Sequence, residues 1–159
     1  MNTIVTQIQN DFVKALKEKN ESAKRALSFL KSKLTEVEKT KKGVNLEDND
    51  VYDVVSKLIK QRKESIEIYT KANRLDLVEK ELQELKIISN YQPVQFSFKE
   101  ILDILTVYYS NLKKSNLKGP ALVGNMVGLF NKSYKGRAEL NLVKSIAEDI
   151  VSEKNFLNG

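Results

Sequence analysis

A group of basic residues near the end of the chain holds the side chains with the clearest chemistry. The group contains Lys132, Lys135, Arg137 and Lys144, with Tyr134 among them and Lys118 somewhat earlier. Lysine and arginine neutralise phosphates, and counterion release makes such binding dependent on salt and tolerant of sequence. Tyr134 would add an aromatic ring that stacks on an unpaired base. These residues predict contact with a nucleic acid; the alternative is a solvated surface with Tyr134 in the core.

The distribution of charge favours the same part of the chain. The sequence of 159 residues has 27 Lys and Arg against 21 Asp and Glu, a net charge of +6. Between residues 113 and 144 there are seven basic residues and one acid, Glu139, so this stretch has an excess equal to that of the whole protein. Clustered positive charge indicates a polyanionic partner better than total charge does.

Two glycines four residues apart, Gly124 and Gly128, lie within an apolar pattern of helical period. Each costs a helix about 1 kcal/mol relative to alanine, so the pair needs a reason. At this spacing they share one face and let another backbone come close, which predicts tight packing between soluble helices. The stretch is too short, and its flanks are too polar, for a membrane helix pair. Gly136, between Lys135 and Arg137, predicts a turn before the last helix.

Arg62 is the unusual residue of the first half, because it falls on the apolar seam of its helix. The seam runs through Val55 and Leu58, reaches position 62 and continues beyond it. A guanidinium that leaves water needs a partner, since an unpaired buried charge is costly. Arg62 therefore predicts an ion pair with a carboxylate of a neighbouring helix. The functional alternative places it in a recognition groove with Gln61 and Ser65.

The chain contains no cysteine and no histidine. This excludes disulfides, thiolate zinc sites, thiol nucleophiles and histidine acid–base pairs. Helix caps and surface charge explain the carboxylates, and the sequence has neither a glycine-rich phosphate loop nor a nucleophile elbow. We expect no catalytic residue, no metal site and no cofactor, and therefore a protein that is not an enzyme.

Apolar residues recur at helical spacing nearly throughout, which predicts an all-α protein of about seven helices. Four helices fall within residues 1–90 and three within 97–157, joined by a linker at about 91–96. The predicted domains are an N-terminal helical bundle over 1–92 and a C-terminal three-helix domain over 93–159.

Several helix starts carry recognisable signals. Residues 48–50 offer acidic and asparagine caps for the third helix. Ser97 and Glu100 have the spacing of a capping box, and Pro120 suits the first turn of the sixth helix. The residues expected to face inward include Leu16 in the first helix, Leu75 and Leu82 in the fourth, and Leu140 in the last.

The sequence also bears on location. No apolar run approaches the roughly 20 residues that span a bilayer. The first residues lack the basic start and apolar block of a signal peptide, and the absence of cysteine is compatible with a reducing compartment. We expect a cytoplasmic protein that does not enter a membrane.

Three segments of the chain resemble the YqeY family. Residues 60–67, with the letters KQRKESIE, resemble the family's KQR-[RK]-ES-I helix. Residues 124–128 are similar to its G-K-V-M-G helix, and residues 135–138 are similar to its KGRA turn. The order and spacing of the three segments fit across nearly the whole length. The family is in turn similar to the C-terminal tail of the B subunit of glutamyl/aspartyl-tRNA amidotransferase, and to an extension of some glutaminyl-tRNA synthetases.

The resemblance implies an N-terminal bundle followed by a three-helix tail domain, which in amidotransferases helps to hold the body of tRNA. The sequence departs from the family at polar positions of that surface. Glu139 and Leu140 replace the acidic residue and glycine of KGRADG, Gln92 replaces the leucine of YLP, Ser28 stands where an arginine is common, and Asn125 where a lysine is usual. These changes concern the function more than the fold.

Two functions are compatible with these observations. The first is a non-catalytic protein that binds tRNA or assists a tRNA amidotransferase, with the basic group on phosphates and the glycines shaping the surface. The family label of carbon–nitrogen ligase activity with glutamine as amide donor would then describe the relatives. The second is an interaction module that docks on a tRNA amidotransferase, an aminoacyl-tRNA synthetase or another partner through an apolar groove between the two domains, without nucleic acid.

Overall fold

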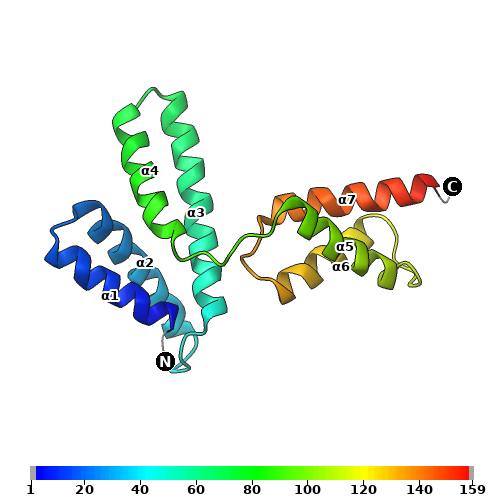
Figure 1. Ribbon diagram of the computed structural model, residues 1–159, viewed down its shortest axis with the longest axis horizontal. Coiled ribbons are helices and arrows are strands. Elements are labelled where there is room, and N and C mark those ends of the chain that lie inside the picture. Colours follow the sequence, from blue (N-terminus) through cyan, green and yellow to red (C-terminus); the bar gives the residue numbers. More distant parts are fainter. Residues whose placement is uncertain (1–2, 158–159) are drawn as a thin grey trace. The chain divides into compact units, whose positions relative to one another are not determined.

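The computed structural model describes residues 3–157, the side chains of residues 154–157 excepted, and the regular structure in that range is entirely helical. Seven helices follow one another there: α1 (Ile4–Lys17), α2 (Glu21–Thr40), α3 (Asp48–Lys71), α4 (Leu75–Ser89), α5 (Phe98–Leu112), α6 (Pro120–Ser133) and α7 (Leu140–Leu157) (Figure 1). The predicted all-α class is confirmed.

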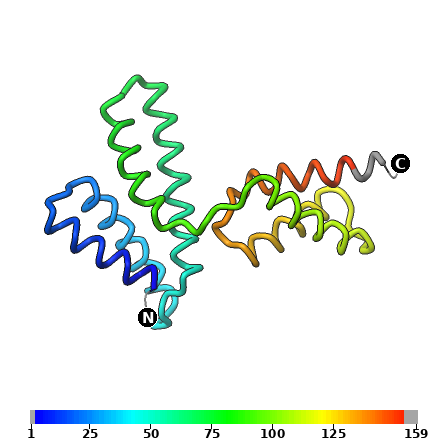
Figure 2. The backbone as a smooth tube through the Cα atoms, viewed as in Figure 1, coloured from blue at the N-terminus to red at the C-terminus, as the bar shows by residue number. Residues whose placement is uncertain are grey.

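The chain forms two compact units, residues 1–92 and residues 93–159. Figure 2 traces the backbone through both: α1–α2 and α3–α4 are each a helical hairpin, and α5, α6 and α7 follow after an extended segment. Each unit has a separate apolar core. Left-handed residues close the hairpin turns of the first unit, Lys19 after α1 with a φ of +54° and Asn73 after α3 with a φ of +56°.

In the first unit α2 packs against α1, α3 and α4, and α3 packs against α1, α2 and α4, so these two helices lie at its centre. The buried apolar residues of this core are Ile8, Ala15, Ala26, Leu27, Leu30, Leu34, Val51, Val54, Val55, Leu58, Ile59, Ile88 and Tyr91. The Tyr91 hydroxyl donates a hydrogen bond to Asp11 Oδ2 at 2.6 Å. Burial and this carboxylate both raise the pKa of Tyr91 above its ordinary value. The bond ties the segment after α4 to α1.

The inward face of α4 differs from the prediction. The exposed fractions of Leu75 and Leu82 are 64% and 49%, although the apolar pattern places both inside. The inward positions are held instead by Glu84, which is 5% exposed, and by the fully buried Ile88. Arg62 of α3 explains the difference, because it pairs with acidic side chains of α4 and so places them on the seam. An apolar pattern alone does not include such a pair.

Two further leucines predicted to face inward are exposed. Leu16 and Leu140 each have an exposed fraction of 45%. Ala15 is buried in α1 beside Leu16, and in α7 the buried series begins at Val143. Both leucines lie within the terminal turn of their helix, where the neighbouring helix no longer covers every side.

The helix starts follow local chemistry, with one correction. The capping box of α5 is confirmed: Glu100 N–H donates to Ser97 Oγ, and Ser97 N–H donates to Glu100 Oε1, both at 3.2 Å. Pro120 is the first residue of α6, as predicted. In α3 the cap is Glu47 rather than a residue of 48–50, and Glu47 N–H donates to Asp50 Oδ2 at 2.8 Å.

The second unit is a three-helix domain in which α5, α6 and α7 all pack against one another. Its buried apolar residues are Ile101, Leu105, Tyr109, Leu122, Val123, Met126, Phe130, Val143, Ile146, Ala147, Ile150 and Val151. The inward residues of α6 follow a spacing of three and four, so the opposite side of this helix faces away from the core.

Candidate nucleic-acid interface

The turn between α6 and α7 is bonded to the segment that leads into the second unit. Phe96 N–H donates to the Arg137 carbonyl at 2.8 Å, and the Gln95 side-chain amide donates to the Gly136 carbonyl at 2.7 Å. Gly136 has a φ of +77°, in the left-handed region where a side chain is strained. The KGRA segment is therefore part of the architecture of this unit and shapes the entry to α7.

Arg137, predicted to contact phosphate, is held by the same segment. Its Nε donates to the Val94 carbonyl at 2.8 Å, and its guanidinium carbon lies 3.8 Å from the centre of the Phe96 ring. The pKa of Glu100 is lowered, mainly by the hydrogen bonds from Ser97 and to a smaller extent by Arg137. Arg137 thus holds the turn after α6 against the segment before α5 (the latch contact below), a role that the sequence does not predict.

Tyr134 packs in an aromatic cluster. Its ring centre lies 5.1 Å from that of Phe96 and 5.5 Å from that of Phe130, and the first of these contacts is edge to face. Such pairs stabilise a core through ring contact. These contacts favour the alternative, a packing residue, and stacking of the half-buried Tyr134 on a base stays a prediction.

The predicted basic group is divided by the length of α6. Lys118 is exposed and precedes this helix, whereas Lys132, Lys135 and Arg137 lie at or beyond its other end (Figure 1). A helix of 14 residues is about 20 Å long. Residues that form one cluster in the sequence thus form two groups in space, because a straight helix separates them.

Lys132 and Lys144 are the exposed members of the second group, and Lys135 is half-buried. Lys144 Nζ lies 3.9 Å from Glu148 Oε1, and the two side chains are 63% and 54% exposed. A pair this exposed contributes little to stability and exchanges readily for another anion. Lys132 and Lys144 are therefore the residues best placed to meet phosphates at this end of α6.

Gly124 and Gly128 occupy the exposed side of α6, opposite its buried residues. A Cβ added at either glycine would meet no heavy atom within 4 Å, apart from the local atoms of the helix. The Asn125 side-chain amide folds back and donates to the Ala121 carbonyl at 2.9 Å. The prediction that the glycines allow close packing within the fold is wrong. They form a strip of bare backbone on the surface, which we call the glycine strip.

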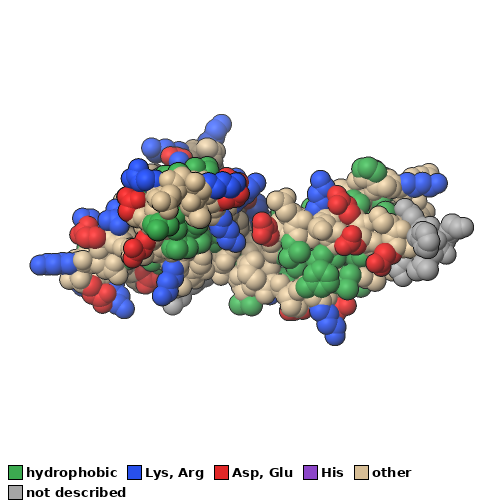
Figure 3. Space-filling view, turned by 90° about the horizontal axis from the view of Figure 1, so that it is seen from above, with side chains coloured by type: hydrophobic (Ala, Val, Ile, Leu, Met, Phe, Trp, Pro, Cys, Tyr) green, Lys and Arg blue, Asp and Glu red, His purple; other side chains and the backbone are tan. Residues whose placement is uncertain are grey.

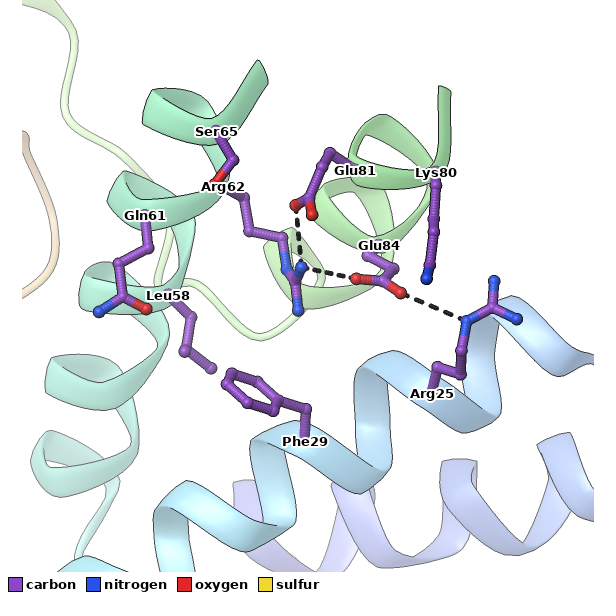
Figure 4. Close-up of a pocket in the computed structure, with 9 residues that line it drawn as sticks. All are labelled: Arg25, Phe29, Leu58, Gln61, Arg62, Ser65, Lys80, Glu81 and Glu84. Atoms are coloured by element: carbon purple, nitrogen blue, oxygen red, sulfur yellow. Dashed lines mark hydrogen bonds and ion pairs between the residues drawn. The ribbon is translucent and has the colours of Figure 1, made fainter. Parts of the chain in front are cut away.

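Arg62, in the first unit, has the ion pairs that the structural interpretation predicts. Its Nη1 lies 2.9 Å from Glu81 Oε2 and 2.6 Å from Glu84 Oε2 (Figure 4). Arg25 of α2 joins the cluster, with its Nε 3.4 Å from Glu84 Oε1. The side chains of Arg62, Glu81 and Glu84 are only 14%, 16% and 7% exposed. Arg62 thereby connects α3 to α4, and Glu84 connects both to α2.

The same cluster borders a groove of about 390 Å³ among α2, α3 and α4. Gln61 and Ser65 are among its lining residues, as the functional alternative for Arg62 predicts, and Phe29 lines it from α2. Sequence analysis did not find Phe29 or the two glutamates. The available signal was the pair of acids three residues apart, Glu81 and Glu84, on the helix that follows a buried arginine.

Apolar side chains are also exposed on the second unit. Figure 3 shows a group of hydrophobic side chains on one face of this unit, with acidic side chains beside it. The most exposed large apolar residues of this unit are Val94 at 79%, Phe98 at 59% and Val107 at 58%.

Two kinds of feature are not found among the described residues. None of their helices has the length and apolar character of a membrane span, and no group of three or more acidic side chains could hold a metal ion.

A protein family described as Yqey-like protein matches residues 5–151. Curated relatives carry the name altered inheritance of mitochondria protein 41, mitochondrial. The relative from Lachancea thermotolerans is 38% identical over 114 residues, 70% of this chain and 61% of that protein. The one from Kluyveromyces lactis is 39% identical over 88 residues, 55% of this chain and 48% of that protein. The one from Pyrenophora tritici-repentis is 28% identical over 158 residues, 96% of this chain and 83% of that protein.

These relatives correct one expectation and leave others as predictions. They are named as mitochondrial proteins, which contradicts the expected cytoplasmic location. The chain spans about half to three-fifths of the first two relatives, at 48% and 61% of their lengths. Their names mention neither tRNA nor an amidotransferase.

Proposed function

The chain belongs to the YqeY-like family, and from this premise we propose that it is a non-catalytic protein that binds tRNA through its second unit. The similarity of this unit to the tail of the amidotransferase B subunit supports a tRNA amidotransferase or an aminoacyl-tRNA synthetase as the enzyme that it serves. The absence of cysteine and histidine supports a role without catalysis by this chain.

The observation that carries the proposal is the glycine strip with lysines at both ends. No side chain projects at Gly124 or Gly128, so a nucleic-acid backbone can approach the helix closely. Lys118 precedes the strip and Lys132 follows it, on a helix about 20 Å long. A duplex presents on the order of ten phosphate charges over that length. The wide, shallow minor groove of an RNA helix would admit this side of α6, with the lysines on the flanking phosphates.

Binding of the full chain to bulk tRNA at about 50 and 200 mM salt tests this proposal. We expect affinity to fall steeply with salt. Replacing Lys132 and Lys144 together by glutamine should reduce the slope of log K against log salt by about 2, because each lysine accounts for about one unit. The matched control is Lys14→Gln with Lys71→Gln, which removes the same charge from exposed pairs in the first unit.

A leucine at Gly128 tests the glycine strip directly. There is room for the side chain on the free protein, since nothing lies within 4 Å of the added Cβ. Gly128→Leu should therefore fold normally and bind tRNA at least tenfold more weakly. Binding equal to that of the unaltered protein would place the interface elsewhere.

Protein docking is the second candidate function, favoured by the exposure of Phe98 and Val107 on the second unit. Docking through apolar side chains resists salt, whereas phosphate contacts do not. A chain that fails to bind tRNA even at about 50 mM salt, and that captures a tRNA amidotransferase at high salt after nuclease treatment, would replace the first proposal by the second.

A further inference from the structure

The groove among α2, α3 and α4 has the size and lining of a small-ligand site. Its volume of about 390 Å³ lies toward the lower end of the range for ligand pockets. Phe29 and Leu58 provide an apolar side, and Phe29 is 42% exposed although it is a large aromatic residue. Gln61 and Ser65 add neutral polar groups on α3 (Figure 4).

Charges in this groove do not balance. Arg25, Arg62 and Lys80 contribute three positive charges, and Glu81 and Glu84 contribute two negative ones. Figure 4 shows the Lys80 ammonium pointing toward the side of Glu84 that Arg25 contacts. One positive charge is therefore in excess beside an apolar surface, and this excess attracts an anion.

The guanidinium of Arg62 supplies an independent observation. Its Nη1 serves both glutamates, but its Nε is buried and has no hydrogen-bond partner among the described residues. Buried donors are nearly always paired, so a missing acceptor here needs an explanation. A planar carboxylate fits the fork of a guanidinium, so a carboxylate is the kind of acceptor that this arginine lacks.

We propose that this groove binds a small carboxylate with an apolar body, either as a free molecule or as the C-terminal residue of a peptide. The apolar body would lie against Phe29 and Leu58, and the carboxylate would meet Arg25, Lys80 and Arg62. A phosphate suits the site less well, because it brings nearly two negative charges beside two resident carboxylates. This site lies in the first unit and does not depend on tRNA binding by the second.

A titration of the full chain followed by the chemical shifts of its backbone amides tests the proposal. The probes are N-acetyl-L-phenylalanine and N-acetyl-L-leucine, with N-acetyl-L-phenylalaninamide as the uncharged control. We expect saturable shifts around Arg25, Phe29, Arg62 and Lys80, and binding at least tenfold weaker for the amide. Absence of localised shifts with both acids, or equal binding of the phenylalanine acid and its amide, would overturn the proposal.

Two substitutions test which basic side chains bind the carboxylate. Lys80→Met and Arg25→Met should each weaken binding of the acid at least fivefold. Their matched controls are Lys86→Met on α4 and Lys24→Met on α2, which are exposed residues outside the groove. Equal affinities for Lys80→Met and Lys86→Met, with both proteins folded, would contradict the assignment.

Peptides ending in phenylalanine, with a free or an amidated C-terminus, identify the source of the carboxylate. If the peptide with a free C-terminus binds and the amidated peptide does not, the groove is a binding site for the C-terminal residue of a peptide. If neither peptide binds while N-acetyl-L-phenylalanine does, the site is one for small molecules.

Discussion

Two of the three family motifs of this chain lie in opposite environments. Arg62, a charged residue of the KQRKES segment, is enclosed between helices with a side chain only 14% exposed. Gly124 and Gly128, residues that usually serve packing, lie on the surface with no neighbouring atom within 4 Å of an added Cβ. The usual expectation is the opposite. A charged side chain is expected at the surface, and a glycine within a helix is expected where another element packs closely.

The difference teaches what each motif does. Arg62, held by two glutamates, connects α3 to α4, and Glu84 extends the cluster to Arg25 of α2, so the first motif serves the architecture of the first unit. A pair of glycines that touches nothing within the fold costs helix stability without a structural return. This cost is compatible with the role proposed above for the glycine strip, as a surface that an RNA backbone approaches closely. At the KGRA turn, Arg137 bonds to the segment before α5, whereas Lys132 and Lys144, which flank the turn in the sequence, are exposed.

The largest expected effect is on the enclosed arginine. Arg62→Met leaves Glu81 and Glu84 without their main partner, and breaking a buried pair in this way costs about 3 kcal/mol of unfolding free energy. Urea denaturation of the full chain measures the loss. Arg74→Met, which removes an exposed pair with Asp76, is the control and should leave the denaturation midpoint unchanged. Equal midpoints for the two variants would show that the Arg62 cluster does not hold the helices.

Arg137→Met should produce the next largest loss, confined to the second unit. The variant lacks the bond to Val94 and the contact with Phe96, together about 2 kcal/mol. Hydrogen exchange at Phe96 N–H, which donates to the Arg137 carbonyl, measures the opening of the turn. If exchange there is unaltered while tRNA affinity falls, Arg137 acts on the nucleic acid rather than as a latch.

The glycines should respond in opposite directions. Gly124→Ala and Gly128→Ala should each raise the unfolding free energy by up to about 1 kcal/mol, because alanine restricts the unfolded chain and meets no atom in the helix. Gly136→Ala should lower it by about 1 kcal/mol, since its φ of +77° strains a side chain. Thermal midpoints at neutral pH give all three values. Destabilisation by alanine at Gly124 or Gly128 would restore the packing interpretation.

The smallest expected effect is the pH dependence of the α5 cap. The hydrogen bonds from Ser97 hold the pKa of Glu100 below its ordinary value near 4.5. The carboxylate form therefore stabilises the folded state above that value, and the contribution is lost as the pH falls through the lowered pKa. Denaturation at several pH values between about 6 and 3 should show the unaltered protein approaching Glu100→Gln on the acid side. Unfolding free energies of the two proteins that differ by a constant amount over this pH interval would exclude the effect.

Much of the helical arrangement could be predicted because it depends on neighbours in sequence. Apolar spacing, the Ser97–Glu100 box and Pro120 act within a turn or two of the chain, and the structure has helices where they indicate them. The seam of α4 could not be found in this way. Glu81 and Glu84 join it because Arg62, 19 residues before Glu81, meets both carboxylates across a helical hairpin.

The candidate interface shows the same division at a larger scale. Sequence alone determined the all-helical class, the positions of the motifs and the excess of positive charge between residues 113 and 144, since these are properties of composition and local period. Only the tertiary structure decided which faces are covered. It packed Tyr134 against Phe96 and Phe130, and it left the two glycines of α6 without a neighbouring helix. The physical reason is that the burial of a side chain depends on which helix faces pack against each other, and this packing involves helices that are far apart in the sequence.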